Sequence, residues 1–242
     1  MLPHIAHQVL LVRSHELHLS VRVKLELDRV GKAYLDRWES GFDFYYDELH
    51  EFHMDQILSS GLKPITEDFL DTVKTSSKAL DPDVERVVEE YFLDVFYRGR
   101  LVMINDTTHK RLRNLVKNQD RTEPRIRRRL RKAYNRVSLD RAKSIAITET
   151  HTFTQSMAHY LVTRDQAPVE RGWITVIDGR ERGPLDHFNH RAMHGTVVGL
   201  NEPYEVPMRG GGTESILFPG DANASPANRL NCRCTQFYRL GA

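Results

Sequence analysis

The sequence has little cysteine and no long apolar run. Two of its 242 residues are cysteines, Cys232 and Cys234, and a single residue separates them. Two cysteines cannot build a disulfide framework, and a one-residue gap suits a disulfide poorly, so we expect reduced thiols or metal ligands. No apolar run approaches the roughly 20 residues that a membrane-spanning helix needs. The N-terminus also lacks the charged and apolar regions of a signal peptide, so we expect no membrane contact.

The chain also lacks internal repeats and a recognisable phosphate-binding loop. Its one run of glycines, Gly210–Gly212, is not followed by the lysine and serine that such a loop requires. What is present is ordinary for a soluble protein, with 40% hydrophobic and 28% charged residues. A chain of this length can bury a sizeable core, as one large domain or two small ones.

Charge is strongly segregated although the net charge is only +2. Residues 39–96 carry 15 acidic and 4 basic side chains, whereas residues 98–143 carry 16 basic and 4 acidic ones. Because the two excesses nearly cancel, we favour pairing between these segments together with contact to a partner protein. The alternative is that residues 98–143 contact the phosphates of DNA non-specifically.

Apolar residues recur at helical spacing through the first two thirds of the chain. Asn105–Thr107 is expected to cap one helix, and Ser138 or Asp140 to begin another. The expected helices cover residues 8–38 (one helix, or two joined near Gly31), 42–58, 66–73, 81–100, 109–119, 125–135 and 138–163.

The character of the sequence changes after Asp165, where glycine and proline become frequent between β-branched runs. We expect short strands over residues 173–177, 196–200 and 236–240. The predicted fold class is therefore α+β. A largely helical, charge-segregated region over residues 1–136 precedes a small α+β module over residues 137–242, with short strands and long loops.

Two histidines and the two cysteines form a candidate metal site. His187 and His190 are three residues apart, so a helical turn or tight loop places both rings on one side. Cys232 and Cys234 would face opposite sides of a regular strand, and they converge only if their segment turns. A structural zinc ion on these four side chains would stabilise a glycine-rich module with little core. The alternative is two surface histidines and two small buried packing residues.

A catalytic alternative uses the same module. Asp178, His190, His194 and Asn231 could form a metal-dependent nuclease centre, in which one histidine activates water for attack on a phosphodiester. Residues 148–151, which include Glu149, carry polar groups inside an expected helix, and a solvated or locally paired helix face explains them better than catalysis.

Five segments of the second half occur in a recognisable order: Arg141–Thr150 (RAKSIAITET), Trp173–Arg182 (WITVIDGRER), His190–Gly195 (HRAMHG), Phe218–Asp221 (FPGD) and Asn231–Cys234 (NCRC). Together they resemble the phage head morphogenesis domain of the phage Mu F type, which occurs in minor head proteins of tailed phages. The resemblance covers about residues 125–242. Some members of that family carry Cys-x-x-Cys at the place of His187-x-x-His190, which favours the zinc hypothesis, and others keep only the histidine that matches His190.

Membership would imply a virion component present in few copies and associated with the portal vertex, without an established reaction. Our leading hypothesis is therefore a minor capsid protein that is not an enzyme. It would act in head assembly by contacts with portal, scaffold or major capsid proteins, and residues 39–96 would suit docking to a basic surface. The alternative is a metal-dependent nuclease or an effector-type enzyme that uses Asp178, His190 and Asn231.

Overall fold

The computed structural model describes residues 2–39, 54–58, 60–64, 67, 97–120, 123–164, 169–177 and 179–240. The chain divides into two compact units, residues 1–146 and 147–242, whereas the sequence suggested a boundary after residue 136. The first unit is helical and the second contains small antiparallel sheets, which confirms the α+β class. Most of the acidic segment lies outside the described residues, as do most of the expected helices over 42–58, 66–73 and 81–100. No described helix is both long enough and apolar enough to cross a membrane.

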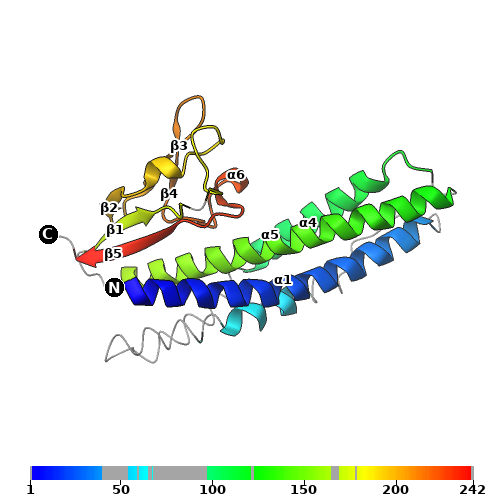
Figure 1. Cartoon of the computed structure of the whole chain (residues 1–242), viewed down its shortest axis with the longest axis horizontal. Helices are drawn as coiled ribbons and strands as arrows, with labels where there is room; N and C mark the ends of the chain where they lie inside the picture. Colours follow the sequence, from blue (N-terminus) through cyan, green and yellow to red (C-terminus); the bar gives the residue numbers. More distant parts are fainter. Residues whose placement is uncertain are drawn as a thin grey trace. The chain divides into compact units, whose positions relative to one another are not determined.

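Among the described residues, unit 1 contains α1 (Leu2–Glu39), α4 (Tyr97–Val116) and the first part of α5 (Pro124–Arg164), which Figure 1 draws in blue and green. Residues 54–58 and 60–64 of this unit are also helical. Helix α1 runs through Gly31 without a break. The buried apolar side chains at the C-terminal end of α1 pack with those of α4 and α5, in a cluster of Val30, Tyr34, Leu35, Trp38, Leu112, Val116, Leu130 and Tyr134.

Two expected helix starts are wrong. Asn105–Thr107 lies inside α4, and Ser138 and Asp140 lie inside α5. Ser138 is buried, and its hydroxyl lies 2.6 Å from an Asp28 carboxylate oxygen and 3.0 Å from the Asn135 carbonyl oxygen. Because these contacts satisfy the hydroxyl within a continuing helix, Ser138 does not act as a cap.

Unit 2 contains two small antiparallel sheets. The first has the order β2-β1-β5, formed by β1 (Val169–Ile174), β2 (Val197–Gly199) and β5 (Thr235–Leu240). The second is a hairpin of β3 (Tyr204–Pro207) and β4 (Thr213–Ile216), which the sequence did not predict. The strand expected over residues 173–177 ends at Ile174 and begins earlier, because Val169–Ile174 pairs along the whole of β5.

The core of unit 2 forms around Trp173, which is fully buried. The last part of α5 is joined to the sheet by polar contacts: Gln155 donates to Thr235 Oγ1 over 3.1 Å, and the Asn231 N–H donates to Thr148 Oγ1 over 3.0 Å. Thr148, Glu149 and Thr150 are buried, so the solvated helix face expected for residues 148–151 is wrong. Thr148 faces the irregular segment before β5, because the Asn231 N–H of that segment donates to it.

Candidate metal centre

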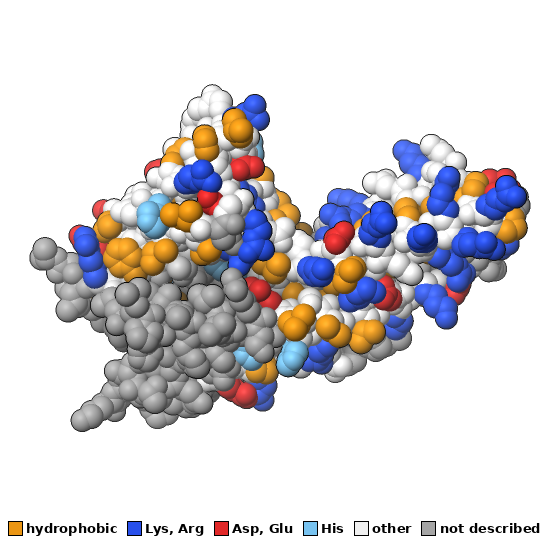
Figure 2. Space-filling model, in the orientation of Figure 1, with side chains coloured by type: hydrophobic (Ala, Val, Ile, Leu, Met, Phe, Trp, Pro, Cys, Tyr) orange, Lys and Arg blue, Asp and Glu red, His pale blue; other side chains and the backbone are white. Residues whose placement is uncertain are grey.

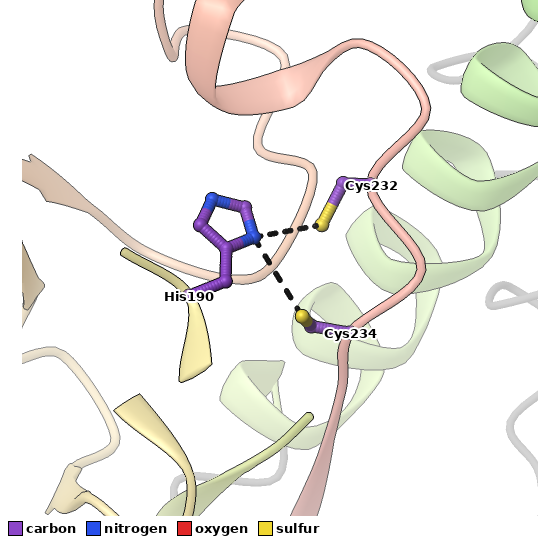
Figure 3. A group of neighbouring side chains, drawn as sticks. All are labelled: His190, Cys232 and Cys234. Atoms are coloured by element: carbon purple, nitrogen blue, oxygen red, sulfur yellow. Dashed lines mark hydrogen bonds between the residues drawn. The ribbon is translucent and has the colours of Figure 1, made fainter. Parts of the chain in front are cut away.

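Three soft donor side chains of unit 2 converge in its interior. The ligand atoms of His190, Cys232 and Cys234 all lie within 4.8 Å of one another. Figure 3 shows both sulfur atoms pointing toward one ring nitrogen: His190 Nδ1 lies 3.7 Å from Cys232 Sγ and 3.6 Å from Cys234 Sγ. All three side chains are buried, with exposed fractions of 1%, 1% and 3%, and the cysteines are not joined in a disulfide.

The cysteines converge because their segment turns before the strand begins. Strand β5 starts at Thr235, so neither sulfur is held to the alternation of a strand. Asn231 adopts a left-handed backbone with φ of 56°, and the Cys232 N–H donates to the Arg229 carbonyl oxygen over 3.0 Å. Asparagine tolerates this conformation better than most residues. This turn lets both sulfurs face the same side, although only one residue separates Cys232 from Cys234.

His190 is held from its backbone and from one face of its ring. It directly precedes the 3-10 helix η2 (Arg191–Met193), and the Thr175 hydroxyl donates to its carbonyl oxygen over 2.9 Å. The edge-to-face contact with Trp173 has a centroid separation of 5.5 Å and an interplanar angle of 83°. These contacts fix the ring in one orientation.

The far nitrogen of the ring enters a chain of polar contacts. His190 Nε2 lies 2.6 Å from Asn228 Oδ1, in the short helix α6 (Pro226–Arg229), and Asn228 Nδ2 donates to Glu214 Oε2 over 2.8 Å. Glu214 also accepts from the Ser225 N–H and hydroxyl. Since the amide nitrogen of Asn228 donates to a carboxylate, its oxygen must accept from Nε2–H. The proton of the neutral ring is thereby assigned to Nε2, and the Nδ1 lone pair faces the two sulfurs.

The electrostatics agree with this arrangement. Burial raises the pKa of Glu214, but the hydrogen bonds from Ser225 and Asn228 outweigh it, so the pKa lies below its usual value and the carboxylate stays ionised. Between the thiols, the contact with Cys234 lowers the pKa of Cys232, and the same contact together with burial raises that of Cys234. The contact between the two thiols thus makes Cys232 the more acidic of the pair.

The structure does not bring the fourth expected ligand to this cluster. His187 is exposed, and its ring packs edge-to-face on Phe188 with centroids 4.7 Å apart. Of the residues in the nuclease hypothesis, Asn231 lines a cleft together with His190. His194 is exposed and its Nδ1 accepts the Thr175 N–H, while Asp178 lies outside the described residues.

A cleft adjoins the cluster and is partly lined by His190, Cys232 and Cys234 themselves. The cleft is basic, because three arginines and one glutamate line it besides the donors. The other lining residues are Val176, Arg180, Glu181, Arg182, Asn231 and Arg233. The carboxylate of Glu181 pairs with Arg191, and Arg182 donates to the Leu230 carbonyl oxygen. The cleft therefore presents cationic groups beside the donor cluster.

Sequence reasoning identified the three donors and missed the residues that hold them. Asn228 and Glu214 are far from His190 in the sequence, and only the folded chain brings them into contact with it or with each other. No sequence motif links either residue to His190. The buried asparagine within a Pro-Ala-Asn-Arg helical turn was the one available signal. A Pro-Ala-Asn-Arg sequence is too common to identify Asn228 as the hydrogen-bond partner of His190.

Comparison with known proteins places the chain in a family. The family model for "Phage Mu protein F like protein" matches residues 106–237, more than half of the chain. The chain is also 30% identical over 95 residues to the uncharacterized protein YqbB of Bacillus subtilis (strain 168). That match covers 39% of this chain but only 29% of YqbB. No solved structure matches. The resemblance carried by the five ordered segments is thus confirmed, and the chain belongs to the phage Mu protein F-like family, which is associated with phage head morphogenesis.

Proposed function

We propose that this chain is a minor head protein of a tailed phage and acts in head assembly at or near the portal vertex. Its action is contact with portal, scaffold or major capsid protein, and its place is the virion. The family match carries this proposal. The match begins in α4 and extends to β5, so it includes all of the donor cluster and its supporting residues.

An exposed apolar stripe on α1 supports a role in protein contacts. Leu17, Val21 and Leu25 are 64%, 54% and 66% exposed, although their neighbours Leu19 and Val23 are buried. Spacings of four residues place the three exposed side chains along one face of the helix. Single exposed apolar residues are common on proteins, whereas a continuous line of them marks a surface that binds another protein.

The surroundings of His190 disfavour its use as a general base. A general base needs an accessible lone pair on a nitrogen that can reach substrate. His190 Nε2 is bound to Asn228, and its Nδ1 faces the two sulfurs in a buried setting. His190 is therefore poorly placed to activate water as the nuclease alternative requires.

Complementation of a phage strain deleted for this gene tests the proposal. We expect the deletion to lower particle yield, packaged DNA or infectivity, and the wild-type gene to restore them. A variant with Leu17, Val21 and Leu25 changed to Ser should fold but fail to enter heads or to co-purify with portal protein. The matched control is Arg22→Ser on the same helix, which should behave as wild type. Normal infectious heads from the deletion strain would overturn the proposal.

The nuclease alternative has its own test. Purified protein incubated with plasmid and a divalent metal should leave the plasmid intact. Metal-dependent nicking that is lost in His190→Ala but kept in His187→Ala would establish the enzyme instead.

A further inference from the structure

We propose that His190 Nδ1, Cys232 Sγ and Cys234 Sγ bind one zinc ion, with a fourth, exchangeable ligand supplied from the adjoining cleft. Two thiolates and an imidazole are the donor set that zinc prefers in proteins. The site thus differs from the four-ligand site expected from the sequence, because it excludes His187.

The spacing of the donors fits a tetrahedral ion. Bonds of ~2.3 Å to sulfur and ~2.1 Å to nitrogen at a tetrahedral angle separate the nitrogen from each sulfur by about 3.6 Å. The two separations in the structure are 3.7 Å and 3.6 Å. Both nitrogen–sulfur separations therefore match those expected around a tetrahedral zinc ion, and the three ligand atoms lie within 4.8 Å of one another.

Hydrogen bonding alone explains this arrangement poorly. Nδ1 carries a single lone pair in the plane of the ring, so it can accept a well-directed bond from one thiol but not from two. Both sulfurs of Cys232 and Cys234 nevertheless stand at nearly equal distances from it. A cation shared by all three donors accounts for the symmetry.

The hydrogen bond at the second ring nitrogen of His190 is of the kind that metal-bound histidines make. Metal-bound histidines usually donate their other ring N–H to a fixed acceptor, which sets the tautomer and the ring orientation. Here Asn228 Oδ1 is that acceptor at 2.6 Å, and the ionised Glu214 fixes the amide in turn. The chain of contacts ends in a negative charge, which raises the basicity of the ring toward a cation.

The fourth position faces the cleft. His190, Cys232 and Cys234 line it together with Arg180, Arg182 and Arg233, and no further cysteine or histidine is among its lining residues. Three protein ligands with an open fourth position leave room for water or a small anion. The arginines favour an anion there.

Metal titration of the reduced, full-length chain tests the proposal. We expect one equivalent of zinc after purification without chelator or affinity-tag metal. Cobalt(II) should bind in its place with thiolate-to-metal charge-transfer absorption and the intense visible bands of a tetrahedral site. Absence of stoichiometric binding of either metal to the folded wild-type chain would overturn the proposal.

Substitutions distinguish a site with three protein ligands from one that also includes His187. Cys232→Ser, Cys234→Ser and His190→Gln should lose the charge-transfer signal or metal stoichiometry, whereas His187→Ala should keep both. Asn228→Ala should weaken zinc affinity by about 10–100-fold while the ligand set is intact. Asn201→Ala, at an exposed position of the same unit, is its control. Loss of metal in His187→Ala would contradict the three-ligand site.

Azide tests the open position. Added azide should change the visible spectrum of the cobalt form, because it can replace the exchangeable ligand. A spectrum unchanged at saturating azide would show a closed site and overturn that part of the proposal.

Discussion

A fully buried arginine organises the sheets of unit 2. Arg171, on β1, has no exposed surface, and its guanidinium donates to the carbonyl oxygens of Gly199, Glu202 and Leu217. It also lies over the Tyr204 ring, 5.1 Å from the centroid. One side chain thus links β1 to three backbone carbonyls, one in β2, one in the segment that follows β2 and one in the segment that follows β4.

Replacement of this arginine by lysine should destabilise unit 2. An ammonium group cannot reach three carbonyl groups in the planar geometry that the guanidinium provides, so Arg171→Lys should cost roughly 2–4 kcal/mol of unfolding free energy. Urea unfolding followed by tryptophan fluorescence measures this. Arg239→Lys is the control, because the exposed pair of Arg239 with Glu170 contributes at most about 1 kcal/mol. Equal effects of the two substitutions would refute the role given to Arg171.

His159 should make the free energy of unfolding depend on pH. Burial, with a contribution from Arg171, lowers the pKa of His159 from 6.5 to about 4, and its ring packs against Phe218. Between these two values the unfolded chain binds a proton that the folded chain does not. Stability should therefore fall as the pH decreases from about 6.5 to about 4 and be fully present above 6.5.

Because His159 is only partly buried, the loss should be on the order of 1–2 kcal/mol. Unfolding free energies measured at several pH values should show a weaker dependence in His159→Phe than in wild type. His187→Gln, at an exposed position, should leave the dependence unchanged. An NMR titration that gives His159 a pKa near 6.5 would contradict the prediction.

The contact between α1 and α5 depends on a glycine inside a helix. A Cβ at Gly31 would lie 1.8 Å from Tyr134 Cε1, and the Tyr134 hydroxyl donates to the Leu27 carbonyl oxygen. Alanine normally favours a helix over glycine by about 1 kcal/mol. Here the clash dominates, so Gly31→Ala should destabilise unit 1 by about 1–3 kcal/mol.

The smaller side chain of Tyr134→Leu should relieve that clash. In a double-mutant cycle, Gly31→Ala should therefore cost less in the Tyr134→Leu background than in wild type. Thermal unfolding of the four proteins measures the coupling. Purely additive effects would show that the ring does not set the distance between the helices.

Sequence patterns predicted helices better than helix ends. The expected helices over residues 125–135 and 138–163 are one continuous helix, α5, because Ser138 is buried against Asp28 instead of capping a new helix. The hairpin of β3 and β4 was missed since its strands are only four residues long and are separated by several glycines. Tertiary contacts, which the local sequence does not encode, decided both cases.

The sequence singled out three side chains that come together in the fold, but it did not predict which histidine would be left out or which residue would hold His190. Two cysteines one residue apart and a close pair of histidines suggested metal chemistry, and the structure brings Cys232, Cys234 and His190 together. The helical spacing that also selected His187 does not apply, because residues 184–190 form turns and a single β-bridge at Phe188 instead of a helix. The supporting Asn228 depends on the folding of a separate segment onto the histidine.

At the scale of the whole molecule, the two units share one long helix but differ in surface character. Figure 2 shows Lys and Arg side chains gathered at the end of unit 1 where α4 and α5 are joined. The exposed basic residues of α4, α5 and their connection that form no ion pair with a described residue are Lys110, Arg111, Arg113, Lys117, Arg125, Arg128, Arg129, Lys132, Arg136 and Lys143. Arg131 differs, because it pairs with Asp36 of α1 over 2.6 Å.

The pairing expected between this basic segment and residues 39–96 stays a prediction, since most of the acidic segment lies outside the described residues. The exposed cations favour the alternative, contact with DNA. Spacings of three and four residues align Arg125, Arg128, Lys132 and Arg136 along one face of α5. A continuous cationic face of this kind binds phosphate backbones without reading sequence.

We therefore expect the chain to bind duplex DNA non-specifically and with a steep dependence on salt. Neutralising six phosphates gives a slope of about −5 in a plot of log affinity against log salt concentration. Titration of labelled duplexes of unrelated sequence measures it. Changing Arg125, Arg128 and Lys132 to Ala should weaken binding and reduce the slope by about 3, since each substitution removes one phosphate contact. Changing Arg22, Arg209 and Arg239 removes the same charge elsewhere and should have little effect. A slope near zero would instead favour neutralisation of this surface by the acidic segment within the chain, and protein contact alone would then remain as the basis of the proposed role in head assembly.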